Sequence, residues 1–141
     1  MSKPQDIIES LVALLKNDND LRQYVDQRVY KGIRDNTINF PYIVIEPINM
    51  LEIDDTYPMQ KMRMSLFVAG FFKTIDPDNQ IDELYRFENM VKKAIGADRR
   101  LGETVAHIEM SQSAYEFALW PVRNFSIEVG IQFEQDSRTR T

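Results

Sequence analysis

The feature that most constrains the fold is a strict two-residue alternation near the C-terminus, in the segment NFSIEVGIQFE. Phe125, Ile127, Val129, Ile131 and Phe133 are apolar, and the residues between them are small or polar. Successive side chains of a β-strand point to opposite faces, so the pattern predicts a long strand with one dry and one wet face. Such a strand requires neighbouring strands and an apolar layer that covers its dry face.

Other segments have extended patterns as well. In residues 62–69, Met62, Met64, Leu66 and Val68 alternate with Arg63, Ser65, Phe67 and Ala69, which predicts a strand with one mainly apolar face. Gly70 follows them, which suggests a bulge or a close approach of another chain segment. Residues 104–110 and the short piece 28–30 also indicate strands.

A further strand is predicted at residues 42–45, which are apolar at every position. Apolar residues on both faces are typical of a central strand with a cover on each side. Pro41 favours an extended Phe40 and a sharp start to this strand. Pro47 indicates that pairing ends on one side or that a bulge lies there, and we expect the strand to continue to Ile53.

Apolar residues spaced three and four apart predict the helices. One stripe follows Pro4, and residues 21–25 suggest a short second helical segment. Residues 76–78 (Asp-Pro-Asp) are typical of a helix start, and Gly96 of a helix end, which predicts a long helix at about 77–95. The first stripe consists of Ile7, Ile8, Leu11, Val12, Leu14 and Leu15, and the last of Ile81, Leu84, Phe87, Val91, Ala94 and Ile95.

The predicted order of elements is α, β, β, β, α, β, β. It indicates an α+β fold, in which a mixed, mainly antiparallel sheet of about four to five strands packs against an N-terminal helix and the long helix at about 77–95. A length of 141 residues favours one domain, which we place at residues 1–135. We expect the polar residues 136–141 to be a disordered tail.

Composition excludes several classes of protein. The chain has no cysteine, so a disulfide framework, a thiol nucleophile and a cysteine-based metal site are all excluded. A net charge of −5 argues against a general duplex-binding surface. The N-terminus lacks the pattern of a signal peptide and no apolar run is long enough to span a bilayer, so we expect a soluble protein made inside the cell, without a membrane partner.

No motif in the sequence assembles a reaction centre. His107 is the only histidine, and it shares a strand face with Glu109. A metal site usually needs three or four ligands, so a structural or surface role is the better interpretation. We therefore expect no catalytic residue, no cofactor and no metal. A small enzyme or ligand-binding domain remains an alternative, because folding can assemble carboxylates that are far apart in sequence.

Apolar residues gather in two segments that we interpret as loops. The first is at the middle hairpin and includes Tyr57 and Met59, and the second precedes the last strand and includes Tyr115, Phe117 and Trp120. Aromatic residues and methionine are enriched at protein–protein interfaces, so these five residues are candidate contacts with another subunit. The alternative is that they cap the open ends of the core.

Read in order, the elements resemble a known family. A helical start leads to Arg28-Val29-Tyr30, a loop follows, and then comes Phe40-Pro41-Tyr42-Ile43-Val44-Ile45. Over residues 5–135 this pattern resembles the small tail-terminator or tail-completion proteins of long-tailed bacteriophages, the lambda-like minor tail family. The loop before Phe40 lacks further prolines and the hairpin at 54–61 begins with acids, so a neck protein or head–tail connector component is an alternative branch.

The resemblance implies a structural virion protein, assembled in the cytoplasm of the bacterial host. Such a protein forms a ring, usually a hexamer, that caps the tail tube, ends its polymerisation and offers a surface for joining the head. Its partners would be further copies of itself, the tail-tube protein and a head-completion or neck protein, with DNA only passing through the lumen. We expect Arg34 and Asp35, in the loop at 31–39, to lie at a subunit contact.

Overall fold

The computed structural model describes residues 3–32, 39–56, 58–102, 105–116 and 121–136. Three helices pack on a five-stranded sheet that is mostly antiparallel, which confirms the predicted α+β class. The elements are α1 (Lys3–Asn17), α2 (Asn19–Val25), β1 (Val29–Lys31), β2 (Tyr42–Thr56), β3 (Met59–Lys73), α3 (Gln80–Ala97), β4 (His107–Glu116) and β5 (Val122–Asp136).

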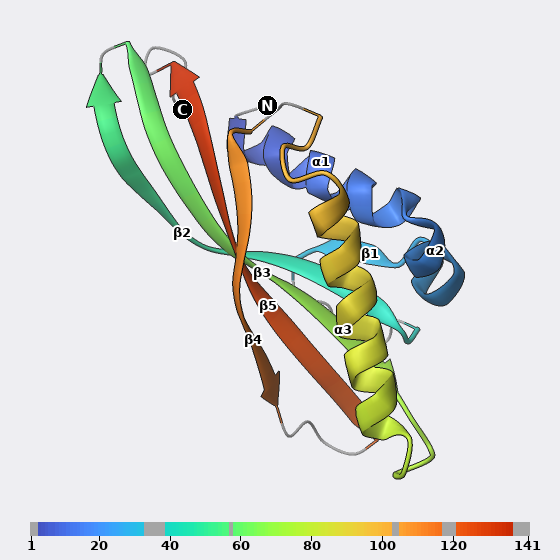
Figure 1. Ribbon diagram of the computed structural model, residues 1–141. Helices are drawn as coiled ribbons and strands as arrows, with labels where there is room; N and C mark the ends of the chain where they lie inside the picture. The colour runs from blue at the N-terminus through green and yellow to red at the C-terminus, as the bar shows by residue number, and fades with distance from the viewer. Residues whose placement is uncertain (1–2, 33–38, 57, 103–104, 117–120, 137–141) are drawn as a thin grey trace.

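The sheet has the strand order β1-β2-β3-β5-β4. β1 and β2 are parallel, and the other neighbouring pairs are antiparallel. Figure 1 shows the three helices on one face of this strongly twisted sheet. The hairpin between β2 and β3 projects away from α2 and α3, and the end of β5 runs beside it.

The core lies between the helices and the dry face of β5. The five alternating apolar residues of β5, from Phe125 to Phe133, are each at most 2 % exposed. They pack in one cluster with residues of α1 and α3, such as Leu11 and Phe87. The rings of Phe87 and Phe125 meet edge to face, with their centroids 5.0 Å apart. The amphipathic strand predicted from the alternation is therefore confirmed, and the helices supply its cover.

Residues 42–45 are buried on both faces of β2, as their composition predicted. Ile43 and Ile45 belong to the core that is shared with the helices. Tyr42 points to the opposite face, where its ring stacks on Phe71 with centroids 4.9 Å apart. β2 lies between β1 and β3, so the predicted central position is confirmed for this part of the strand.

The long helix begins later than the Asp-Pro-Asp motif predicted. α3 starts at Gln80, and its N-cap is Asn79, whose side chain makes no capping bond. The carboxylate of Asp76 instead accepts hydrogen bonds from the backbone N–H of Asp78 (3.0 Å) and from the Asn79 amide (2.6 Å). These local bonds hold the motif as a turn before the helix.

Two further details of this helix differ from expectation. Gly96 does not end α3 but lies within its last turn, because the helix continues to Ala97. Ile81, expected in the buried stripe, is 54 % exposed because it lies in the first turn, ahead of the residues that reach the core.

The segment before β5 is also more regular than the sequence suggested. β4 begins at His107 rather than at residue 104 and continues to Glu116, so Tyr115 lies in a strand and not in a loop. Met59 is likewise the first residue of β3.

Candidate functional site

The second half of β2 has an open backbone edge, and we name residues Pro47–Thr56 the β2 arm. β1 pairs only with Ile43–Ile45. The Ile43 N–H donates to the Arg28 carbonyl, and the Ile45 carbonyl accepts from the Gly32 N–H, both at 2.9 Å. Alternate residues of a strand direct their backbone groups to the same side. After Ile43 and Ile45, the next residue that faces the β1 side is Pro47, which has no N–H to donate. Within the described ranges, no strand pairs with this side of the arm.

The β2 arm also exposes large apolar side chains. Ile48, Met50, Leu51 and Ile53 are between 42 % and 60 % exposed. Ile48 and Ile53 are the extra residues at two register shifts against β3, where bulges redirect the side chains. Four large apolar side chains this exposed within six residues, on both faces of the strand, give the arm the character of a contact surface.

The sheet ends on its other side at β4, which packs against α3. The rings of Tyr85 and Tyr115 lie 5.8 Å apart, and Arg99 donates to the Ile108 carbonyl at 3.3 Å. Lys92 lies between these contacts and forms an ion pair at 3.2 Å with Glu88 of the same helix. Tyr85, Glu88 and Lys92 recur at helical spacing in α3, and Arg99 follows just beyond the end of the helix, so together they form one stripe along β4. We name this stripe, together with the side of β4 that pairs with no strand among the described residues, the β4 edge.

Glu88 is the buried charge that supports the β4 edge. It is 2 % exposed, and the Tyr115 hydroxyl donates to its two carboxylate oxygens at 2.7 and 2.8 Å. Burial alone would raise the pKa of Glu88, but the nearby hydroxyls of Ser113 and Tyr115 and the hydrogen bond and positive charge of Lys92 outweigh it and hold this pKa below its usual value. Burial, together with the bond to Glu88, raises the pKa of Tyr115 to about 12, so the hydroxyl keeps its proton and donates.

Sequence reasoning missed Glu88 because it took the apolar residues of the helix as the whole buried stripe. The available signal was its position, which follows Phe87 and is four residues after Leu84, both of which are core residues. A charged residue at a core-facing position needs a partner, and here the partners come from the same helix and from β4.

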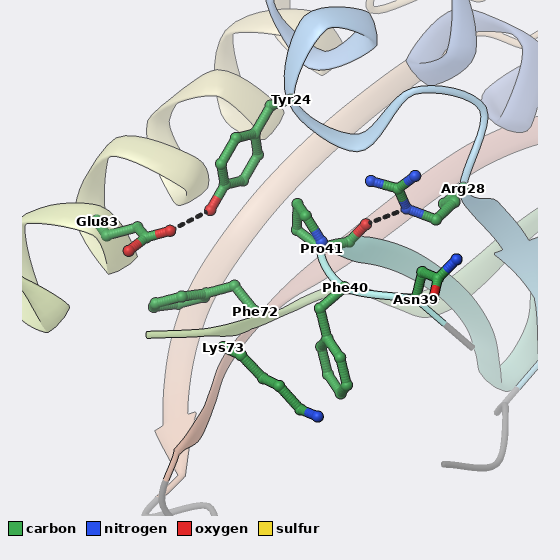
Figure 2. A pocket seen from close by; sticks show the side chains of 8 residues that line it. All are labelled: Tyr24, Arg28, Asn39, Phe40, Pro41, Phe72, Lys73 and Glu83. Carbon is green, nitrogen blue, oxygen red and sulfur yellow. Dashed lines mark hydrogen bonds between the residues drawn. The ribbon is translucent and has the colours of Figure 1, made fainter. Parts of the chain in front are cut away.

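A pocket of about 580 Å³ lies between α2, the start of β2, the end of β3 and α3. Figure 2 shows the Tyr24 hydroxyl donating to Glu83 (2.6 Å) and Arg28 donating to the Pro41 carbonyl (2.8 Å). The lining residues are Tyr24, Arg28, Asn39, Phe40, Pro41, Phe72, Lys73 and Glu83. Most polar side chains of this pocket are therefore hydrogen-bonded to other lining residues. No nucleophile lies beside a base among the lining residues.

Two further results concern sites and membranes. In the part of the chain that the structure describes, no three acidic or histidine side chains are grouped to hold a metal ion. His107 lies beside Glu109 on the same face, as predicted, with Nε2 3.8 Å from the carboxylate. None of the described helices is long and apolar enough to cross a membrane.

Two of the predicted contact residues can be placed. Met59 (42 % exposed) lies at the tip of the β2–β3 hairpin, and Tyr115 (43 % exposed) lies on the β4 edge. Along β5, Met59 is level with Asp136 and Tyr115 with Phe125, so roughly 35 Å separates them along the sheet. The structure does not bring the two together. The other predicted contacts, Arg34, Asp35, Tyr57, Phe117 and Trp120, lie outside the described residues.

Comparisons with known proteins support the fold. No protein-family model matches the chain, and no curated protein matches it. Among solved structures, it is similar to a chain of the "Virion of native gene transfer agent (GTA) particle" with a TM-score of 0.62 and 10 % sequence identity. The similarity covers 89 % of this chain and 92 % of that chain, so nearly the whole of both chains shares one fold.

Proposed function

We propose that this protein is a structural component of a virion-type particle and that it acts as a tail terminator. The observation that carries the proposal is the fold shared with a chain of a gene transfer agent particle, over about nine tenths of both chains. The element order and the Arg28–Tyr30 and Phe40–Ile45 segments, which resemble phage tail-completion proteins, support the same assignment.

In this role the chain forms a ring, most simply a hexamer, on the end of the tail tube. One face of the ring matches the last ring of the tail-tube protein, and the other receives a head-completion or neck protein while DNA passes through the lumen. Tube growth stops because the exposed face does not template another tube subunit. The proposed contacts with neighbouring subunits or with the tube are Arg34, Asp35, Tyr57, Met59, Tyr115, Phe117 and Trp120.

The test is assembly with purified components. The chain is incubated with polymerising tail-tube protein and examined by negative-stain microscopy, with light scattering for the mass of free rings. A terminator yields capped tubes of limited length. Tubes that grow equally long with and without the protein would contradict the proposal.

A neck or head–tail connector component is the second candidate, because the matching structure is a whole particle rather than an isolated tail. The same purified chain is offered to portal-containing heads and to tail tubes in parallel. Binding to heads without any effect on tubes would favour the neck role.

A further inference from the structure

We propose that the β2 arm of one copy pairs with the β4 edge of a second copy, so that neighbouring subunits share one continuous sheet. The inference deepens the proposed function, since it rests on this chain forming a ring and specifies the contact that closes it. It depends on three features of the described residues: two open edges, their charges and the face on which those charges lie.

The two open edges lie on opposite sides of the same sheet. β4 is the last strand in the order, and the β2 arm extends beyond β1 at the other side. Each edge is ten residues long, Pro47–Thr56 in the arm and His107–Glu116 in β4. An unpaired strand edge is a template for another strand, and joining two different edges is a heterologous contact of the kind that closes rings.

The charges favour pairing of unlike edges over pairing of two arms. The arm carries three acids, Glu52, Asp54 and Asp55, and no base. Two arms side by side would bring six acids together, which like-charge repulsion disfavours. The acids of β4, Glu109 and Glu116, lie on the sheet face away from the helices, since they are opposite Gly130 and Asn124. On the helix side the β4 edge presents the cations Lys92 and Arg99 together with two tyrosines, and aromatic residues and arginine are enriched at interfaces.

Two of the three acids of the arm lie on the correct face for this contact, whereas Asp54, opposite Lys61, lies on the other face. Glu52 is opposite Met62 and Asp55 is opposite Gln60, two residues of β3 that are buried on the helix side of the sheet. In a continuous sheet the helix sides of both copies coincide. Glu52 and Asp55 would therefore face the side of the neighbouring copy on which Lys92 and Arg99 lie along β4.

Cysteine cross-linking tests the pairing directly, because the native chain has no cysteine. Leu51→Cys places a thiol on the arm, at a residue 60 % exposed, and Ala114→Cys places one on exposed β4. Each is on the sheet face away from the helices, since their partners Arg63 and Ser126 alternate with core residues. A short bis-maleimide tolerates a small difference in register.

The proposal predicts a distinct product for each sample. Either single variant alone gives no cross-linked species, a mixture of both gives dimers only, and the double variant gives a ladder that ends at the closed ring. Dimers from Leu51→Cys alone would indicate arm-to-arm pairing and overturn the proposal.

A charge exchange provides an independent test. Asp55→Lys and Arg99→Glu should each weaken self-association about tenfold or more, because each places like charges at the contact. Mixing the two variants should restore rings with an even number of subunits, in which the variants alternate. Asp78→Lys, the same charge change in the exposed turn before α3, serves as the control and should assemble like the wild type.

The outcomes separate this inference from the proposed function. If the wild type and every variant form the same rings and cap tubes equally, the edge pairing is wrong and the terminator role stands. If the wild type forms no ring, alone or on tail tubes, and the double cysteine variant gives no ladder, both proposals fall.

Discussion

A methyl group added at Gly70 or at Gly130 would lie equally close to its nearest atom, but the neighbouring side chains differ. A Cβ at Gly70 would lie 2.5 Å from the Phe125 ring and 2.8 Å from the Phe87 ring. A Cβ at Gly130 would also have its nearest atom at 2.5 Å, the terminal guanidinium nitrogen of Arg63. Both phenylalanines are 0 % exposed, whereas the Arg63 side chain is 33 % exposed.

The two alanine substitutions should therefore have different effects on the free energy of unfolding. Overpacking a filled core lowers the free energy of unfolding by about 1–3 kcal/mol. Replacing glycine by alanine reduces the entropy of the unfolded chain, which offsets about 0.5–1 kcal/mol of that loss. Because two fixed rings oppose the methyl group, we expect Gly70→Ala to destabilise by about 2 kcal/mol. Gly130→Ala should stay within about 0.5 kcal/mol of the wild type, since Arg63 can move away and its exposed pair with Glu109 contributes little.

The measurement is urea unfolding followed by circular dichroism at a concentration where the chain is monomeric. The midpoint should fall for Gly70→Ala with an unchanged slope, which reports lost stability rather than a changed unfolded state. In a Phe125→Leu background the cost of Gly70→Ala should shrink by about 1 kcal/mol, since one opposing ring is gone. Equal stability of Gly70→Ala and Gly130→Ala would refute the reasoning.

Two further predictions concern hydrogen bonds at buried or partly buried carboxylates. Glu88→Gln should destabilise by about 1–3 kcal/mol at pH 7, because it removes a buried carboxylate that binds two donors. The folded pKa of Glu88 lies below its ordinary value of 4.5, so this stabilisation is present above pH 4.5 and is lost as the pH falls through the folded pKa. Unfolding curves from pH 7 to pH 3 should therefore bring wild type and variant together at the acid end, and a constant gap would contradict the assignment. Tyr24→Phe should cost about 1 kcal/mol by removing the hydrogen bond to Glu83, and thermal unfolding at neutral pH should show no shift if that bond is absent.

Local sequence patterns identified most of the elements. The alternation at 125–133 and the stripe from Leu84 to Ile95 each report which side chains are buried, because strand and helix geometry repeat with fixed periods. Element ends were less well determined. Hydrogen bonds of Asp76 delayed the start of α3, and Gly96 stayed helical because a single glycine lowers helix stability without forcing a stop.

The sequence proposed contact residues but not the open strand edges. Met59 and Tyr115 were selected because aromatic residues and methionine are common at interfaces, and both prove to be partly exposed. The open edge of the β2 arm was not predicted, although Pro47 indicated either that pairing would end on one side or that a bulge lies there. An open edge is a relation between strands, and it becomes visible only when the strand order is known.

The sequence by itself determined the fold class, the order of elements and the buried face of β5, since these follow from composition and from the spacing of neighbours along the chain. The tertiary structure alone decided that β5 lies between β3 and β4, that Glu88 meets Tyr115, and that no other strand among the described residues pairs with the open edges of the β2 arm and β4. The spacing of apolar residues along a helix or strand specifies which side chains face the core. Strand pairing and buried ion contacts instead depend on segments that are distant in sequence and meet only when the chain folds.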